Sequence, residues 1–364
     1  MLFSSAFPRR QIALSQGGFA WHVWRMKKSH FAIAALSALL LSASMGAART
    51  PPPVEPPPEM PKPLAAPKVF PSPNEIVKAA PAGDWTAIAP SDLLLMELAP
   101  DAKGNTRNVV IQLMPAPFSQ GWVGNIRKLA AAKWWDGLAI VRVQDNYVTQ
   151  WGDPDGEDAA KAKKLPEGLV TVPESAYLYQ NKRGDNNVSL DIKTDTHDKY
   201  AFFNKIWQGW PIGIGYGPQH IVTLQAWPIH CYGMVGVGRN LSPDTGTGAE
   251  LYTVIGHAPR HLDRNIALVG RIIEGMEHMS SLPRGTGDLG FYKTPEERTK
   301  ILSARLMSQM GNDKPLPTYE YLSTESASFA KYADARANRR DPFFIKPAGG
   351  ADICNIPVPV RRKG

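Results

Sequence analysis

The sequence has few cysteines and lacks the motifs of common metal-dependent and serine-nucleophile enzymes. Its 364 residues include two cysteines, Cys231 and Cys354, which do not have the spacing of a metal-binding motif. No nucleophile elbow of the serine hydrolases is present. No run of lysine and arginine indicates a nucleic-acid surface. We therefore expect no metal, no cofactor and no nucleic-acid partner.

The basic charge is concentrated at the N-terminus. Five basic and no acidic residues precede residue 49, and removing those five charges from the net +8 leaves +3. Met26-Lys27-Lys28, the apolar stretch Phe31–Leu41 and the small residues Gly46-Ala47-Ala48 form a pattern typical of a secretory signal. The apolar stretch is too short to span a bilayer comfortably, although an uncleaved anchor is the alternative. We predict cleavage near Arg49, a periplasmic location and no membrane span afterwards.

Composition also divides the chain. Residues 1–48 are predicted to hold an upstream extension and the signal peptide. Residues 49–73 form a proline-rich linker, because 11 of the 33 prolines lie between Thr50 and Pro73. Such a segment is extended and has no core of its own. It either spaces the domain from its signal, which we favour, or reaches across the envelope.

The most informative stretch runs from Trp135 to Pro154. An apolar strand, Leu138–Val143, carries Arg142, and a buried arginine must find hydrogen-bond acceptors. Asp145-Asn146 then predicts a turn, and Tyr147–Gln150 a second strand. Period-2 alternation puts Tyr147, Thr149 and Trp151 on one face of that strand and Val148 and Gln150 on the other. By itself, Arg142 is either a salt-bridged barrel residue or a functional one.

This stretch resembles the core signature of the cyclophilins, a family of prolyl isomerases. The matching residues are Trp135-Asp136-Gly137, Arg142-Val143, Tyr147 and Gln150-Trp151-Gly152-Asp153, whereas Ile140-Val141 departs from the family's Phe-His. Two further segments, at 233–256 and 261–279, resemble the family's second and third signatures in the right order.

The resemblance implies a mainly β fold: a closed antiparallel β-barrel with capping helices, a large insertion and a C-terminal helical extension. The cyclophilin-like domain is then residues 74–290, its insertion about 155–230, and residues 291–364 an extension packed on the barrel. The insertion's Trp207, Trp210 and Trp227 either pack on the barrel, which we favour, or extend a peptide groove.

The resemblance also implies the site and the activity. Arg142 would bond the substrate carbonyl and proline nitrogen, and Gln150 would orient it. The predicted substrate-binding residues are Tyr147, Val148, Arg239, Glu250, Tyr252, His261, Leu262 and Ile266. Arg239 and Glu250 replace two neutral amides with opposite charges, which predicts that they form an ion pair.

The implied function is peptidyl-prolyl cis-trans isomerisation of proline-containing segments of unfolded or exported proteins, by a monomer. The alternative is a catalytically silent cyclophilin-like peptide-binding chaperone or envelope scaffold. His261, Ile266 and Tyr252 stand where the family usually has tryptophan, histidine and phenylalanine, so rate and substrate preference stay open.

Other patterns predict structure without chemistry. Strands are expected at 93–96, 109–113 and 301–307, and helices at Trp122–Leu129, from Thr294 and at Ser323–Arg340. The segment GTGDLG, residues 285–290, matches a dinucleotide-binding pattern but has no flanking strand and helix, so we interpret it as a loop. Cys231 and Cys354 either pair or are two separate thiols.

Overall fold

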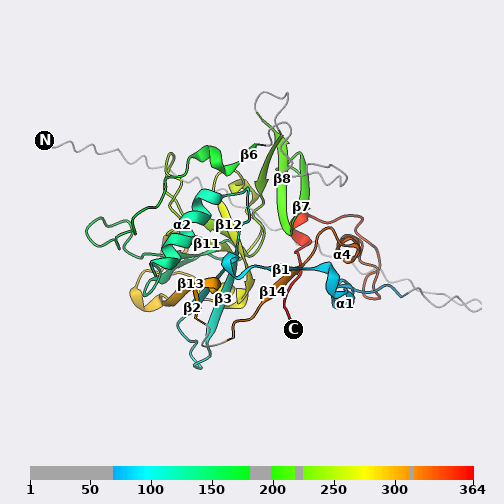
Figure 1. The fold of residues 1–364 in the computed structure, drawn as a ribbon, viewed down its shortest axis with the longest axis horizontal. Helices are drawn as coiled ribbons and strands as arrows, with labels where there is room; N and C mark the ends of the chain where they lie inside the picture. The colour runs from blue at the N-terminus through cyan, green and yellow to red at the C-terminus, as the bar shows by residue number, and fades with distance from the viewer. Residues whose placement is uncertain (1–68, 181–197, 218–223, 312–314) are drawn as a thin grey trace, which may run out of the picture. The chain divides into compact units, whose positions relative to one another are not determined.

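The computed structural model describes residues 69–180, 198–217, 224–311 and 315–364, all within the compact unit Ala66–Gly364 (Figure 1). The signal peptide and most of the proline-rich linker lie outside the described residues and stay predictions. The first described helix, α1 (Pro73–Ala79), begins with a capping box between Ser72 and Glu75. In the described parts of the chain, no helix is long and apolar enough to cross a bilayer.

An eight-stranded antiparallel sheet forms the barrel. Its strands, in spatial order, are β13 (Ile301–Leu306), β2 (Leu93–Leu98), β3 (Arg107–Leu113), β12 (Leu268–Glu274), β10 (Met234–Val237), β11 (Leu251–Val254), β5 (Val148–Gly152) and β4 (Ala139–Val143). The two outer strands meet: the Ile140 N–H donates to the Thr299 carbonyl at 2.8 Å, and the Ile301 N–H to the Leu138 carbonyl at 2.7 Å. The predicted mainly β barrel is confirmed, and its sheet includes the strand expected at 301–307.

The strand β5 shows how the sequence pattern builds the barrel. Thr149 and Trp151 are 0% and 1% exposed, and they lie on the face that forms the interior. Val148 and Gln150 alternate with them on the outer face, as the period-2 pattern predicts. Val148 is itself buried on that face, so Gln150, which is half-buried, is the β5 side chain that the outer face presents.

The helix α2 (Gln120–Ala131) covers the barrel and contacts β12 and β13. Trp122, Ile126 and Leu129, which recur at helical spacing, are each 0% exposed. Burial of each such side chain contributes about 1.5–3 kcal/mol, so this face holds the helix on the barrel. A shorter helix, α3 (Met276–Ser280), follows β12.

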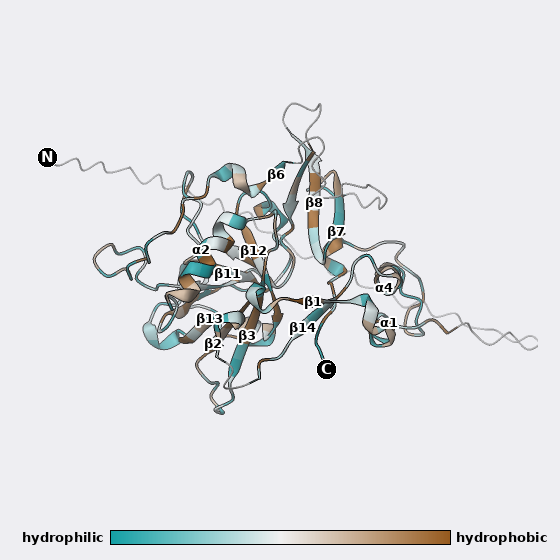
Figure 2. Ribbon diagram, in the orientation of Figure 1, coloured by the Kyte–Doolittle hydropathy of each residue, from teal (hydrophilic) through white to brown (hydrophobic). Residues whose placement is uncertain are grey.

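Residues of the predicted insertion form a separate four-stranded sheet. Its strands, in order, are β6 (Tyr179–Gln180), β9 (Leu224–Pro228), β8 (Trp210–Tyr216) and β7 (Phe203–Trp207). Six of the seven β8 residues are buried, and Figure 2 shows much of this strand in brown. Trp207, Trp210 and Trp227 are 6%, 1% and 2% exposed. Trp207 and Trp210 belong to the hydrophobic core that includes the barrel strands, as predicted, whereas the Trp227 ring lies against Gly213 and Gly215 of the insertion's own sheet.

The C-terminal segment adds a three-stranded sheet and a helix. In the sheet, β14 (Tyr319–Leu322) pairs with β1 (Trp85–Ile88) and with β15 (Val360–Arg362). The helix α4 (Ala327–Ala337) packs against α1. It is shorter than the predicted Ser323–Arg340, because the Ser326 side chain accepts the Phe329 N–H and so caps the helix there.

The structure also decides two further expectations, the pairing of the cysteines and the helix from Thr294. Cys231 and Cys354, 123 residues apart, form a disulfide, so of the two alternatives the paired one is correct. The helix predicted from Thr294 is only one 3-10 turn, η6 (Pro295–Glu297), with a capping box. After that turn the chain extends into β13, because Ile301 is drawn into the barrel core.

Candidate functional site

Three neighbouring strands place three of the predicted site residues in one row. Arg142 of β4 lies opposite Gln150 of β5, and Gln150 lies opposite Tyr252 of β11. Residues directly opposite one another in an antiparallel sheet project from the same face. The row therefore runs across the outer face of the barrel.

The guanidinium of Arg142 is held by three acceptors of the same chain. Nε donates to the Leu289 carbonyl at 2.7 Å, Nη1 to Gln150 Oε1 at 3.0 Å, and Nη2 to Gln144 Oε1. The guanidinium carbon, Cζ, lies 5.7 Å from the centre of the Tyr147 ring and 5.2 Å from the centre of the Phe291 ring. Arg142 thus has a fixed orientation between two aromatic rings.

A polar chain continues from Arg142 through Gln150 to Glu250. Gln150 Nε2 donates to Glu250 Oε1 at 2.6 Å, while its Oε1 accepts from Arg142. Because a carboxylate only accepts hydrogen bonds, Glu250 fixes which end of the Gln150 amide faces the guanidinium. Burial raises the pKa of Glu250, although the hydrogen bond from Gln150 opposes that shift.

The predicted ion pair between Arg239 and Glu250 is wrong. Arg239 Nε and Nη2 donate to the Asn265 carbonyl at 3.1 and 2.9 Å, and Nη1 donates to the Asn240 carbonyl at 2.6 Å. Glu250 Oε1 instead accepts from Gln150, which is its diagonal neighbour across the sheet. Three nearby residues have therefore replaced the pair that charge alone predicted.

Beside Arg142 lies an apolar cluster at the positions where the family resemblance predicts the proline pocket, and we use that name for it. It contains Val148, Tyr252 and Val254, with Tyr147 and Ile266 packed against it.

Gly236 and His261 contact the two tyrosine rings of the proline pocket. A Cβ on Gly236 would lie 2.3 Å from the Tyr252 ring, so only glycine lets that ring lie flat on β10. His261 stacks against the Tyr147 ring, with centres 6.3 Å apart. Leu262 is half-buried in the one-turn helix η4 (Arg260–Leu262) and lies outside the cluster.

A buried hydrogen-bonded chain beneath the pocket was not predicted. His230 Nε2 lies 2.8 Å from the Tyr252 hydroxyl, and His230 Nδ1 lies 2.8 Å from Asp263 Oδ1. Asp263 also accepts from Arg260, which in turn donates to Asp198, both at 2.6 Å. The chain therefore links the pocket to the insertion.

The protonation of His230 follows from these contacts. Its side chain is 0% exposed, and burial lowers its pKa, so the ring is neutral at pH 7. Asp263 only accepts, so Nδ1 carries the proton and Nε2 accepts from Tyr252. The Tyr252 hydroxyl hydrogen thus points to His230 and away from the pocket. The sequence signal was the tyrosine at a phenylalanine position, since a buried hydroxyl needs a partner.

The GTGDLG segment forms a loop, as predicted, with one 3-10 turn, η5 (Asp288–Gly290). Its flanks join the edge of β4 next to the contact with β13: the Gly285 N–H donates to the Val143 carbonyl and the Tyr292 N–H to the Val141 carbonyl, both at 3.0 Å. Leu289 has a positive φ of 55° and supplies the carbonyl that accepts from Arg142. The loop therefore borders the site instead of cradling a phosphate.

Comparisons with known proteins agree with this architecture. The family model described as cyclophilin type peptidyl-prolyl cis-trans isomerase/CLD matches residues 103–306. The solved cyclophilin AquaCyp293 from Hirschia baltica has a similar fold, with 22% sequence identity and a TM-score of 0.57, covering 76% of this chain and 92% of that one. A cyclophilin-type isomerase from Cryptosporidium parvum is 11% identical with a TM-score of 0.35, covering 59% of this chain and 96% of its own. A search of curated proteins found no match. Because the family model covers more than half of the chain and the barrel agrees with it, the chain belongs to the cyclophilin-type peptidyl-prolyl cis-trans isomerase family.

Proposed function

We propose that the chain isomerises X-Pro bonds in unfolded or exported proteins in the periplasm, with Arg142 as its catalytic residue. The observation that carries the proposal is the position of the Arg142 guanidinium, held in a fixed orientation beside the proline pocket. A proline ring in that pocket would bring its own amide bond to the guanidinium.

Isomerisation of an X-Pro bond requires little more of the protein than a well-placed hydrogen-bond donor. An X-Pro bond turns slowly because amide resonance opposes twisting. In the twisted state the proline nitrogen regains its lone pair and becomes a better hydrogen-bond acceptor, so a donor held there stabilises that state more than the planar one. A guanidinium has five N–H groups. The chain's own acceptors use three of them, which leaves one on each Nη for the substrate.

Gln150 is a positioning residue in this proposal. Its amide oxygen holds Arg142 Nη1, and its amide nitrogen is held by Glu250. Tyr147, Val148, Tyr252 and Ile266 supply the apolar surface for the proline ring. Because the hydroxyl of Tyr252 is directed to His230, the ring presents an apolar face.

The catalytic role is tested by replacing Arg142 in the full chain. Arg142→Ala should lower the cis–trans exchange rate of an X-Pro peptide, measured by NMR, by about 10²- to 10³-fold, the loss typical of one positioned donor. Arg142→Lys should lose nearly as much, because a point charge cannot replace a planar fork of donors. Arg284→Lys is the matched control, since Arg284 pairs with the exposed Asp145 on the neighbouring turn.

The outcomes separate catalysis from binding. Exchange that is unchanged in a folded Arg142→Lys variant would refute the assignment of Arg142. A native chain that binds the peptide without accelerating exchange would favour the silent chaperone or scaffold. The observation that favours this alternative is the hydrogen bond from Arg142 Nε to the Leu289 carbonyl, because that N–H is then not available to a substrate.

The periplasmic location rests on the sequence pattern from Met26 to Ala48. The disulfide between Cys231 and Cys354 supports it, because such bonds persist in oxidising compartments. Mass spectrometry of the protein from cells should give an N-terminus at or near Arg49 and a mass with no free thiol. An intact Met26 on a cytoplasmic product with free thiols would contradict export.

A further inference from the structure

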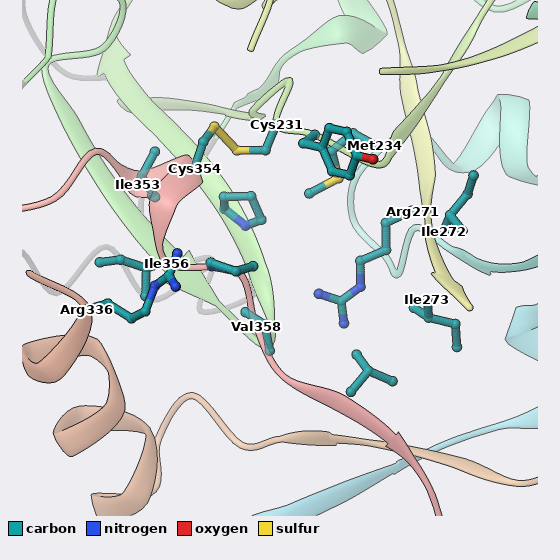
Figure 3. A pocket seen from close by; sticks show the side chains of 14 residues that line it. Cys231, Met234, Arg271, Ile272, Ile273, Arg336, Ile353, Cys354, Ile356 and Val358 are labelled. Carbon is teal, nitrogen blue, oxygen red and sulfur yellow. A yellow bond between two sulfur atoms is a disulfide. The ribbon is translucent and has the colours of Figure 1, made fainter. Parts of the chain in front are cut away.

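A cavity that shares no residue with the proline pocket lies where the barrel meets the C-terminal segment (Figure 3). Its volume is about 300 Å³, at the lower end of the range for ligand pockets. Its walls are mostly apolar and include Met234, Ile272 and Val358, with the disulfide of Cys231 and Cys354 forming one side. The site described above does not account for this cavity.

Arg271 of β12 lines the cavity and carries a buried charge. Its residue is 7% exposed, and Figure 3 shows its guanidinium turned into the space between the surrounding side chains. Nε donates to Gln112 Oε1 at 2.9 Å and Nη1 to the Gly209 carbonyl at 2.7 Å, and the group stacks 4.6 Å from the centre of the Trp210 ring. These contacts are all to neutral groups.

No negative charge compensates Arg271 in the described residues. No carboxylate there forms an ion pair with it, and its buried Nη2 has no acceptor. Burial lowers the pKa of Arg271 to about 10, so the guanidinium is still charged at pH 7. A buried charge without a partner is costly, and an anionic ligand would offset that cost.

A second arginine lines the same cavity. Arg336 of α4 donates from Nε to the Asn355 carbonyl at 2.7 Å and has no ion pair among the residues that the structure describes. Two arginines and an otherwise apolar wall define the complementary ligand. Such a ligand has one anionic head for the unpaired guanidinium of Arg271 and an apolar body for the rest.

We propose that this cavity binds a small alkyl carboxylate, with its carboxylate at Arg271 and its chain along the apolar wall. A carboxylate matches the planar fork of a guanidinium, with which it forms paired hydrogen bonds. A volume of 300 Å³ holds about ten water-sized groups at roughly 30 Å³ each. Octanoate, with eight carbons and two oxygens, has that size.

Calorimetric titration of the full chain with octanoate at pH 7 tests the proposal. We expect one binding site, with affinity for 1-octanol at least tenfold weaker, because the alcohol lacks the charge. Arg271→Gln should weaken octanoate binding at least tenfold. Arg340→Gln is the matched control, since Arg340 lies just beyond α4 and is already paired with Asp334, and it should bind octanoate like the native chain.

A second variant keeps the test decisive if Arg271→Gln does not fold. Val358→Trp fills the cavity while retaining both arginines, and it should abolish binding in a protein whose circular dichroism and isomerase activity are unchanged. Equal affinities for octanoate and octanol, native affinity in Val358→Trp, or no binding of octanoate at millimolar concentration would each overturn the proposal.

Discussion

The hydroxyl of Tyr252 offers the sharpest test of the buried chain beneath the proline pocket. Tyr252→Phe removes only that hydroxyl, which donates to His230 Nε2 at 2.8 Å. His230 cannot respond by moving its proton, because Nδ1–H is committed to Asp263. A fully buried acceptor is left without a donor, and such a loss costs about 1–3 kcal/mol.

The assay compares stability and activity in the same variant. Urea unfolding should show a fall in the free energy of unfolding of about 1–3 kcal/mol, with an unchanged slope against denaturant. Isomerase activity should stay within about threefold, equivalent to roughly 0.6 kcal/mol, because the ring proposed to face the substrate is retained. Tyr292→Phe is the control: its hydroxyl donates to the Pro283 carbonyl, which is only partly buried, so the loss should be smaller.

Two results would refute this reasoning. A Tyr252→Phe variant as stable as the native chain would mean that His230 does not depend on the hydroxyl. A large rise in KM at unchanged stability would mean that the hydroxyl contacts the substrate instead.

Two further predictions concern the same face of the barrel. Burial raises the folded-state pKa of Glu250 above its ordinary 4.5. At pH values between 4.5 and that raised pKa, the folded state holds a proton that the unfolded state has lost. This residue's contribution to stability therefore falls as the pH rises through that range. Glu250→Gln should therefore raise the melting temperature at pH 7 and remove this part of the pH dependence, and an unchanged profile would contradict the burial of the charge. Gly236→Ala should destabilise the fold and lower activity, since the added Cβ would lie 2.3 Å from the Tyr252 ring. The control is Gly124→Ala in α2, where an added Cβ would have no heavy atom within 4 Å, and this substitution should be neutral or stabilising. Equal effects of the two glycine substitutions in thermal unfolding would argue against that close approach.

Local sequence patterns predicted the parts of the molecule that local forces determine. The paired strands around Arg142 and Gln150 follow from alternation and a turn, and α2 follows from apolar residues at helical spacing. The helix expected from Thr294 was overestimated, because tertiary packing draws the chain into β13 after one turn. Propensity is a weak guide where the core competes for the same residues.

The side-chain partners could not be predicted in this way. Arg239 and Glu250 carry opposite charges, yet each finds a nearer partner, and only the register of the sheet puts Gln150 next to Glu250. The chain from Tyr252 through His230 joins residues from the barrel and the insertion, whose proximity no spacing in the sequence reveals. Charge and residue type indicate which groups need partners, whereas the topology of the fold determines which residues become those partners.

The three hydrogen bonds on Arg142 have a consequence for the entropy of catalysis. A free arginine side chain carries about 2 kcal/mol of rotamer entropy, which a catalyst must give up when the side chain is fixed on its substrate. Here Leu289, Gln150 and Gln144 restrict the guanidinium when the chain folds, before any peptide arrives. In the role proposed for Arg142, a substrate would therefore have little side-chain freedom left to remove, and more of the binding energy would be available to favour the twisted amide.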